Sequence, residues 1–153
     1  MSDTTGRTLR RMAEVSAGIG EGRQVVCDLD GTLAVYDGWR GFGSIGDPID
    51  HAADLCRALA DMRCRVLIDT CRLTTARRYG QAQYNAALDT IDQWLERHGF
   101  PSSIEVYTGH GKPIAAAYVD DRGVSARRRP TQILGEIIGL LDEVPPNEGE
   151  GGR

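Results

Sequence analysis

Two aspartates with one residue between them stand in the stretch CDLDGT, residues 27–32, directly after an apolar run. In extended backbone, residues two apart point to the same side, so Asp28 and Asp30 bring two negative charges close together. Gly31 then lets the chain turn sharply. Two carboxylates that share a site either raise one pKa strongly or bind a cation, and their oxygens favour hard divalent ions such as Mg²⁺. This spacing therefore predicts a magnesium site at the end of a strand.

Polar residues also follow two later apolar runs. The segment DTCR, residues 69–72, comes after residues 66–68, and the segment DDR, residues 120–122, comes after residues 115–119. Lys112 lies shortly before the last of these runs. In an open parallel sheet the carboxyl ends of the strands lie along one edge, where ligands bind. We therefore expect all these groups to share one crevice with the two aspartates of the first run.

The elements that would hold these groups follow from the apolar pattern. Short, nearly continuous apolar runs are typical of strands buried on both faces of a parallel sheet. We expect four strands, at residues 25–27, 66–68, 104–107 and 115–119. Apolar residues at spacings of three and four predict helices. We expect these at residues 48–60, 84–98 and 134–141, the first with Asp47 as its N-cap and Pro48 at its first position. Alternating strands and helices predict one α/β domain, a three-layer Rossmann-like parallel sheet.

With Mg²⁺ among the carboxylates, the remaining side chains suit phosphoryl transfer. Asp28 would attack phosphorus and form an aspartyl-phosphate. Asp30 would protonate the leaving oxygen and later deprotonate the hydrolytic water. Thr70 would donate a hydrogen bond to a phosphoryl oxygen, and Lys112 would neutralise charge on the phosphoryl group and on the nucleophile. These four residues are the expected catalytic groups.

The metal shell and the substrate contacts draw on further charged residues. All expected metal ligands are carboxylates, and of the last pair one binds directly and the other directly or through water. These ligands are Asp28, Asp30, Asp120 and Asp121. Arg72 and Arg122 are the expected substrate ligands, because a guanidinium matches phosphate in a bidentate manner.

Together, these motifs resemble those of the haloacid dehalogenase (HAD) superfamily of phosphatases. That family carries Asp-x-Asp-Gly-Thr after its first strand, a Ser or Thr after the second, a Lys before the last core strand and an acidic pair after it. The matching positions here are Asp28 to Thr32, Thr70, Lys112 and Asp120 with Asp121, within residues 23–144. The resemblance implies a Rossmann-like fold, Mg²⁺ dependence and an aspartyl-phosphate intermediate. One departure is Asp69, at a position that is usually apolar.

Many members of that superfamily insert a cap domain, but this chain has no room for a sizeable one. Residues 33–65 are accounted for by a loop and one helix, and residues 73–112 by a long helical stretch and a strand. The chain thus resembles the capless members, whose open sites often accept phosphate at the end of a large molecule. We expect a phosphomonoesterase acting on a nucleotide, a nucleic-acid 3′ or 5′ end or another phosphorylated end group. The alternatives are a phosphotransferase of the same superfamily and a catalytically silent HAD-like binding module.

The stretch GFGSIG, residues 41–46, fits the pattern GxGxxG but lies well beyond the first strand. It therefore lacks the context of a dinucleotide-binding turn. We interpret it as a flap over the crevice, in which Tyr36, Trp39 and Phe42 either offer stacking surfaces or cover the edge of the core.

Composition and charge restrict the partners and the location. The formal net charge of the 153 residues is −4 and the pI is about 5.3, which argues against binding nucleic acid through charge alone. No apolar run approaches the ~18 residues of a membrane-spanning helix, and we see no secretory signal. The four cysteines form no CxxC pair and are expected to be reduced, as in a cytoplasmic protein. Residues 1–22 would form a lead segment, residues 23–144 the catalytic domain and residues 145–153 a disordered tail.

Overall fold

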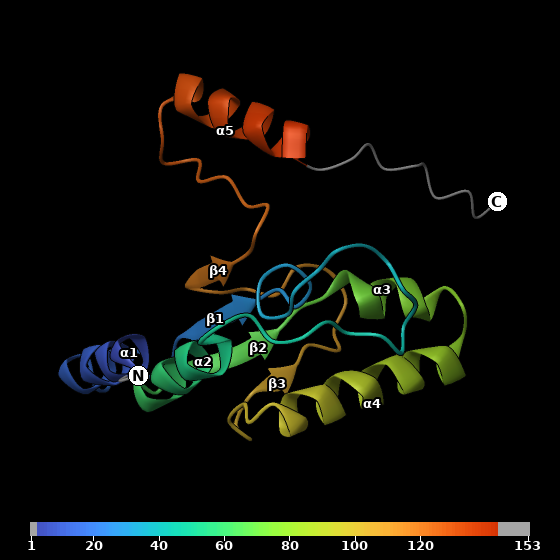
Figure 1. The fold of residues 1–153 in the computed structure, drawn as a ribbon, viewed down its shortest axis with the longest axis horizontal. Coiled ribbons are helices and arrows are strands. Elements are labelled where there is room, and N and C mark those ends of the chain that lie inside the picture. Colours follow the sequence, from blue (N-terminus) through green and yellow to red (C-terminus); the bar gives the residue numbers. More distant parts are fainter. Residues whose placement is uncertain (1–2, 144–153) are drawn as a thin grey trace. The chain divides into compact units, whose positions relative to one another are not determined.

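The computed structural model of this protein describes residues 3–143, which fall into two units, residues 3–121 and residues 122–143. The first unit is built on a four-stranded sheet in which all neighbours run parallel (Figure 1). Its strands are β1 (Gln24–Cys27), β2 (Arg65–Ile68), β3 (Glu105–Val106) and β4 (Ala117–Val119), in the order β3-β2-β1-β4. The predicted α/β class and the parallel sheet of four strands are confirmed.

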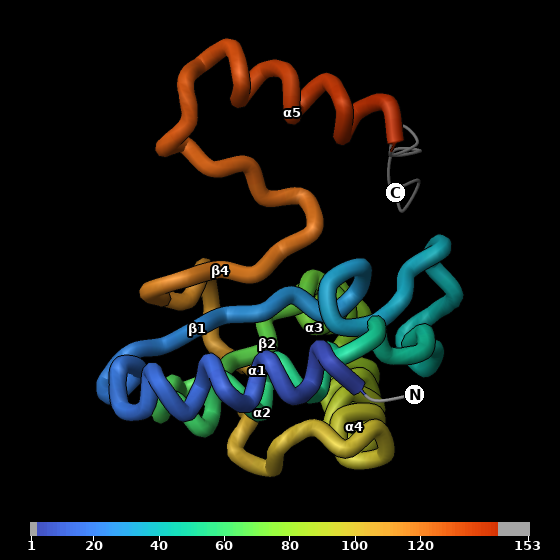
Figure 2. The backbone as a smooth tube through the Cα atoms, turned by 60° about the vertical axis from the view of Figure 1, so that its left-hand side comes forward, coloured from blue at the N-terminus to red at the C-terminus, as the bar shows by residue number. Residues whose placement is uncertain are grey.

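The described part of this unit contains four helices. They are α1 (Thr4–Val15), α2 (Ala52–Asp61), α3 (Cys71–Arg77) and α4 (Gln81–Arg97). Helix α4 matches the predicted helix at residues 84–98, because the apolar residues of that pattern, such as Ile91 and Trp94, are buried. Helix α1 lies within the predicted lead segment and runs beside α2 (Figures 1 and 2).

Helix α2 begins later than the sequence pattern indicates. The predicted first helical residue, Pro48, instead forms an antiparallel bridge with Ala34, and the N–H of Ile49 donates to the carbonyl oxygen of Leu33 at 2.9 Å. These contacts hold the chain extended beside the turn that follows β1. The helix therefore starts only after His51, whose φ of 63° is left-handed.

The apolar core lies between one face of the sheet and the helices α2 and α4. Cys27 of β1 and Ile68 of β2 belong to the same buried cluster as Cys56 of α2 and Ile91 of α4. Neighbouring strand residues such as Val26 point to the opposite face, because side chains alternate along a strand. Packing on one face thus holds β1 and β2 in place. Their carboxyl ends lead to the polar residues that begin at Asp28 and at Asp69. Helix α3 adds Leu73 and Ala76 to the same cluster. Since the helices of this cluster pack on one face of the sheet, the predicted third layer stays a prediction.

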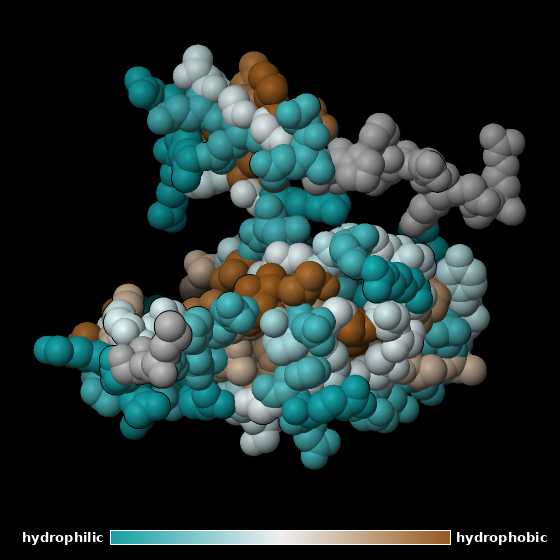
Figure 3. Space-filling view, in the orientation of Figure 1, coloured by the Kyte–Doolittle hydropathy of each residue, from teal (hydrophilic) through white to brown (hydrophobic). Residues whose placement is uncertain are grey.

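The second unit contains helix α5 (Pro130–Glu143), which includes the predicted helix at residues 134–141. Proline suits the first helical position, where its missing N–H is not needed. Figure 3 shows apolar residues, coloured brown, along this helix as well as on the first unit. The exposed apolar residues of α5 are Leu134, Ile137, Ile138 and Leu141. The predicted tail, residues 145–153, lies outside the described residues.

None of the helices within residues 3–143 is both long and apolar enough to cross a membrane.

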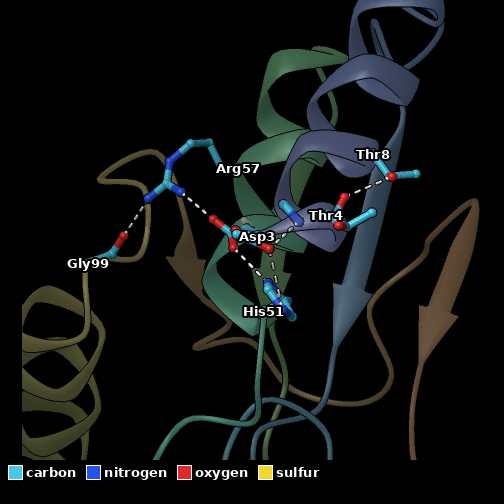
Figure 4. A network of polar contacts seen from close by, with 8 residues as sticks. Asp3, Thr4, Thr8, His51, Arg57 and Gly99 are labelled. Atoms are coloured by element: carbon cyan, nitrogen blue, oxygen red, sulfur yellow. Dashed lines mark hydrogen bonds and ion pairs between the residues drawn. The ribbon is translucent and has the colours of Figure 1, made fainter. Parts of the chain in front are cut away.

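A polar network joins the starts of α1 and α2 to the end of α4 (Figure 4). Asp3 Oδ1, at the start of α1, lies 3.8 Å from Nε2 of His51. Nδ1 of His51 lies 3.1 Å from Oδ2 of Asp54. Arg57 then donates to Asp54 Oδ1 and to the carbonyl oxygen of Gly99, both at 2.9 Å. The network ties the three helices together.

Candidate active site

Three carboxylates meet at the carboxyl ends of β1 and β4. Asp28 directly follows β1, and Asp120 and Asp121 directly follow β4. The parallel pairing continues past β1, because the N–H of Asp28 donates to the carbonyl oxygen of Val119 at 2.9 Å. One oxygen from each of the three carboxylates lies within 4.8 Å of one from the other two. Asp28 is half-buried while Asp120 and Asp121 are exposed, so the group opens to solvent.

The electrostatic surroundings of Asp28 raise its pKa to about 6. Burial is the largest cause, and the N–H of Leu29, which donates to Asp28 Oδ1 at 2.8 Å, opposes it. The negative charges of Asp120, Asp121 and Asp30 raise the pKa further. A divalent cation would offset this repulsion, and an all-oxygen donor set fits Mg²⁺.

The two residues after the aspartate pair hold Asp121 in place. Gly31 has a φ of +84°, and a Cβ on it would lie 2.3 Å from Oδ2 of Asp121. Oγ1 of Thr32 accepts from the N–H of Asp121 at 3.1 Å. The Gly-Thr part of the motif therefore leaves room for an acid from another strand end and hydrogen-bonds to its backbone.

Asp30 is not a member of the three-carboxylate group and pairs with Arg72. Nε of Arg72 donates to Asp30 Oδ2 at 2.9 Å, and Nη2 donates to Oδ1 at 2.7 Å. Nη1 donates to the carbonyl oxygen of Gly41 at 3.0 Å, and the guanidinium carbon lies 4.9 Å from the ring centre of Trp39. The side chain of Arg72 is 2% exposed and that of Asp30 is 12% exposed.

These contacts bear on two expected roles, which stay predictions. The carboxylate of Asp30 is predicted as a metal ligand, but both of its oxygens accept from Arg72 and it is not part of the three-carboxylate group. Arg72 is predicted as a substrate ligand, but each of its guanidinium nitrogens already has a protein acceptor. Arg72, the second residue of α3, points inward beneath the loop that contains Gly41. A charge buried there must be paired. Arg72 is thus a positioning residue for Asp30.

Thr70 and Lys112 both line a pocket of about 370 Å³. Thr70 is the N-cap of α3, and its Oγ1 accepts from the N–H of Arg72 at 3.2 Å. Nζ of Lys112 lies 4.1 Å from the ring centre of Tyr118 on β4. Asp69, which also lines the pocket, donates its N–H to the carbonyl oxygen of Cys27 at 3.0 Å, so the pocket lies next to the end of β1, where Asp28 follows.

Asp69, the departure from the family pattern, also lines this pocket. Burial raises the pKa of its carboxyl, and the nearby charge of Lys112 lowers it. Asp69 is thus under the influence of the charge of Lys112 and is not a member of the three-carboxylate group.

Two arginines remain to be placed. Arg122 is the first residue of the second unit, so its role in substrate binding stays a prediction. Arg77 lines the pocket but is not among the predicted site residues. Its signal is the spacing of Thr70, Thr74 and Arg77, which are four and three residues apart and therefore share one side of a helix that starts after Thr70.

Comparisons with known proteins leave the function to be argued from this site. No protein-family model matches the chain, and neither does any curated protein. One similar solved structure is that of a conserved protein from Bacteroides thetaiotaomicron, with a TM-score of 0.46 and 19% identity, covering 77% of this chain and 90% of that chain. A likeness of this size carries no argument about activity.

Proposed function

We propose that this protein is a Mg²⁺-dependent phosphomonoesterase whose nucleophile is Asp28. The observation that carries the proposal is the meeting of Asp28, Asp120 and Asp121 beyond two paired parallel strands. When bound there, Mg²⁺ would offset the charge of the carboxylates and polarise a phosphoryl oxygen. The resemblance of the ordered motifs to those of HAD phosphatases supports the same assignment.

Asp28 suits nucleophilic attack because only one of its oxygens is engaged. Oδ1 accepts from the N–H of Leu29, whereas Oδ2 has no hydrogen-bond donor among the described residues. In the reaction, a bond would form between a carboxylate oxygen of Asp28 and phosphorus while the bond from phosphorus to the leaving oxygen breaks. The product of this first step is an aspartyl-phosphate, which water then hydrolyses.

The other side chains would move protons and stabilise charge. Asp30, entering the reaction with a proton on one carboxyl oxygen, would give that proton to the leaving oxygen and later regain one from the hydrolytic water. Arg72 holds the Asp30 carboxylate by two hydrogen bonds, so its orientation is set before substrate binds. Thr70 would donate its hydroxyl proton to a phosphoryl oxygen, and Lys112 would offset the negative charge of the phosphoryl group.

We propose hydrolysis rather than transfer to another acceptor, with water reaching the intermediate through an open site. Asp120 and Asp121 are exposed, and the described chain from residue 33 to residue 51 forms loop and turn rather than an inserted domain. Water therefore has access to an intermediate on Asp28. The same openness suits a nucleotide, a nucleic-acid end or another phosphorylated end group as substrate.

The test is phosphate release from p-nitrophenyl phosphate by the purified full chain, with Mg²⁺ and with excess EDTA. We expect release only with the metal, and a loss on the order of 10³-fold or more in Asp28→Asn. Asp61→Asn, at the exposed end of α2, is the matched control that should keep the wild-type rate.

Two outcomes would overturn this proposal. Equal phosphate release with Mg²⁺ and with EDTA would show that the reaction needs no metal. Equal release by the wild type and Asp28→Asn would show that Asp28 is not the nucleophile. An absence of release across a broad panel of phosphate esters, with Mg²⁺ binding intact, would favour the silent binding module. Phosphate recovered on an added alcohol instead of in solution would favour the phosphotransferase.

A further inference from the structure

The pocket beside Thr70 and Lys112 has two walls. One is α3, and the other is the loop between β3 and β4. Nη1 of Arg77, on α3, lies 3.0 Å from Nδ1 of His110 in the loop, and Nη2 of Arg77 donates to the carbonyl oxygen of Thr108. At about 370 Å³ the pocket falls within the range of small-molecule sites.

Arg77 carries a positive charge without a counter-ion among the described residues. Its partners are the His110 ring, the Thr108 carbonyl and the Tyr84 hydroxyl at 3.2 Å, and none of these groups is a carboxylate. The guanidinium carbon also lies 4.6 Å from the ring centre of Tyr84, which holds the side chain against α4. Nε has no acceptor within residues 3–143. The guanidinium is therefore fixed in place and retains both charge and donor capacity.

The remaining charges of the pocket do not cancel that of Arg77. Lys112 is a second cation, and Asp69, the acid that lines the pocket, is already near Lys112. Hydroxyl groups of Thr74 and Thr70 add hydrogen-bonding capacity on the α3 wall. A fixed guanidinium that has no carboxylate partner among the described residues is suited to a phosphate dianion, which it meets with charge-assisted hydrogen bonds.

We infer that this pocket binds a second phosphate group of the substrate, one carried by the leaving group. The inference rests on the proposed function, because Thr70 and Lys112 belong both to the pocket and to the proposed phosphoryl site. It narrows the substrate class from any phosphomonoester to one with a further phosphate near the scissile one. Arg77 would be the residue that determines this specificity.

The kinetic test compares matched esters that differ by one phosphate. The pairs are adenosine 3′,5′-bisphosphate with adenosine 3′-monophosphate, and fructose 1,6-bisphosphate with fructose 1-phosphate. We expect kcat/KM to be at least about tenfold higher for the bisphosphate of one pair in the wild type, as a charge-assisted contact allows. Arg77→Gln should reduce this preference to about twofold or less, the statistical factor for two phosphates. Arg77→Lys should retain part of it.

Arg78→Gln is the matched control, since it removes an exposed charge from the end of the same helix but outside the pocket. The bisphosphate preference should survive in this variant. Circular dichroism and thermal melting establish that each variant is folded. No preference in the wild type, or the same preference in Arg77→Gln, would overturn the inference while leaving the phosphomonoesterase intact.

A binding measurement separates this inference from the proposed function. Isothermal titration of the same ester pairs into Asp28→Asn with Mg²⁺ needs no turnover. Tighter binding of the bisphosphate that is lost in the Asp28→Asn, Arg77→Gln double variant supports the pocket even if no ester is hydrolysed, and equal binding rejects it. A trinucleotide with a 3′-phosphate, measured in parallel, tells whether the second phosphate comes from a small molecule or from a nucleic-acid end.

Discussion

Gly31 is the residue on which the spacing of the three carboxylates depends most directly. A side chain there meets two obstacles, since the φ of +84° disfavours any Cβ and the carboxylate of Asp121 occupies the place of that Cβ. We predict that Gly31→Ala destabilises the fold by about 1–3 kcal/mol and weakens Mg²⁺ binding at least about tenfold. Chemical denaturation and isothermal titration with MgCl₂ measure the two effects.

Gly18→Ala separates the two causes. Gly18 has a similar φ of +80°, but a Cβ on it would meet nothing within 4 Å. This variant should lose stability through backbone strain alone and bind Mg²⁺ as the wild type does. If both variants lose Mg²⁺ binding equally, or if Gly31→Ala retains it, the close approach of Asp121 to Gly31 does not determine Mg²⁺ binding.

Arg72 and Asp30 form a buried pair whose separation should be costly. Removing one partner of such a pair leaves an uncompensated charge, so we predict that Arg72→Gln destabilises the protein by about 3–5 kcal/mol. Arg65→Gln supplies the comparison. Arg65 donates to Glu105 at 2.6 Å with both side chains more than half exposed, and its loss should cost less than about 1 kcal/mol. Similar losses in urea titrations of the two variants would contradict the buried pairing.

At the scale of elements, His51 links the starts of α1 and α2. The hydrogen bond to Asp54 raises its pKa above 6.5, and the charges of Asp3, Asp54 and Asp50 act in the same direction. A base with a raised pKa in the folded state stabilises the fold fully below its unfolded pKa of about 6.5, and this stabilisation is lost as the pH rises through the folded pKa. The contact between the two helices should therefore weaken in mildly alkaline solution.

We predict that the melting temperature of the wild type exceeds that of His51→Asn by more at pH 5.5 than at pH 8.5. Asparagine tolerates the left-handed backbone of this position, which keeps strain out of the comparison. His98→Asn is the control, because His98 packs on Trp94 with ring centres 5.0 Å apart and has no carboxylate partner within the described residues. A difference that does not change with pH for His51→Asn would exclude the charged contact.

Local pattern predicts some of these elements and misses others for identifiable reasons. The strands and α4 follow from apolar periodicity, because burial imposes that pattern directly. The start of α2 does not, since Pro48 and Asp47 have good helix-start chemistry but are held by a bridge to the turn after β1. Helix α3 is short and begins at a polar motif, and such a segment has no apolar period to read.

On the scale of the whole molecule, the site is predictable as far as strand ends determine it. A parallel sheet puts Asp28, Asp120 and Asp121 at one edge, and the direct pairing of β1 with β4 brings them together. The partner of Asp30 is not predictable in this way, because it depends on which side of α3 faces the core. The role of Arg77 is not predictable for the same reason. Arg77 lines a pocket only because the loop after β3 forms the other wall.

Cation binding at the strand ends should couple to the stability of the fold. Without metal, the folded pKa of Asp28 is about 6 against an ordinary 3.8, so the folded state binds more protons in this window. Stability contributed by this group therefore falls as the pH rises from about 4 to 6, and it stays low above that. A divalent ion reverses the trend, because it binds the deprotonated carboxylates of the folded state and competes with the proton.

We predict that 10 mM MgCl₂ raises the melting temperature at pH 7.5 and has much less effect at pH 5. The stabilisation would reach about 2.7 kcal/mol if the ion is at one hundred times its Kd. Asp121→Asn should lose the effect and Asp61→Asn should keep it, while KCl at equal ionic strength accounts for screening. An equal rise in KCl, or an undiminished rise in Asp121→Asn, would mean that the ion acts on the general charge of the protein and not at the three carboxylates. A rise confined to Mg²⁺, high pH and an intact Asp121 would place the ion where β1 and β4 end, because only the folded sheet brings those residues together.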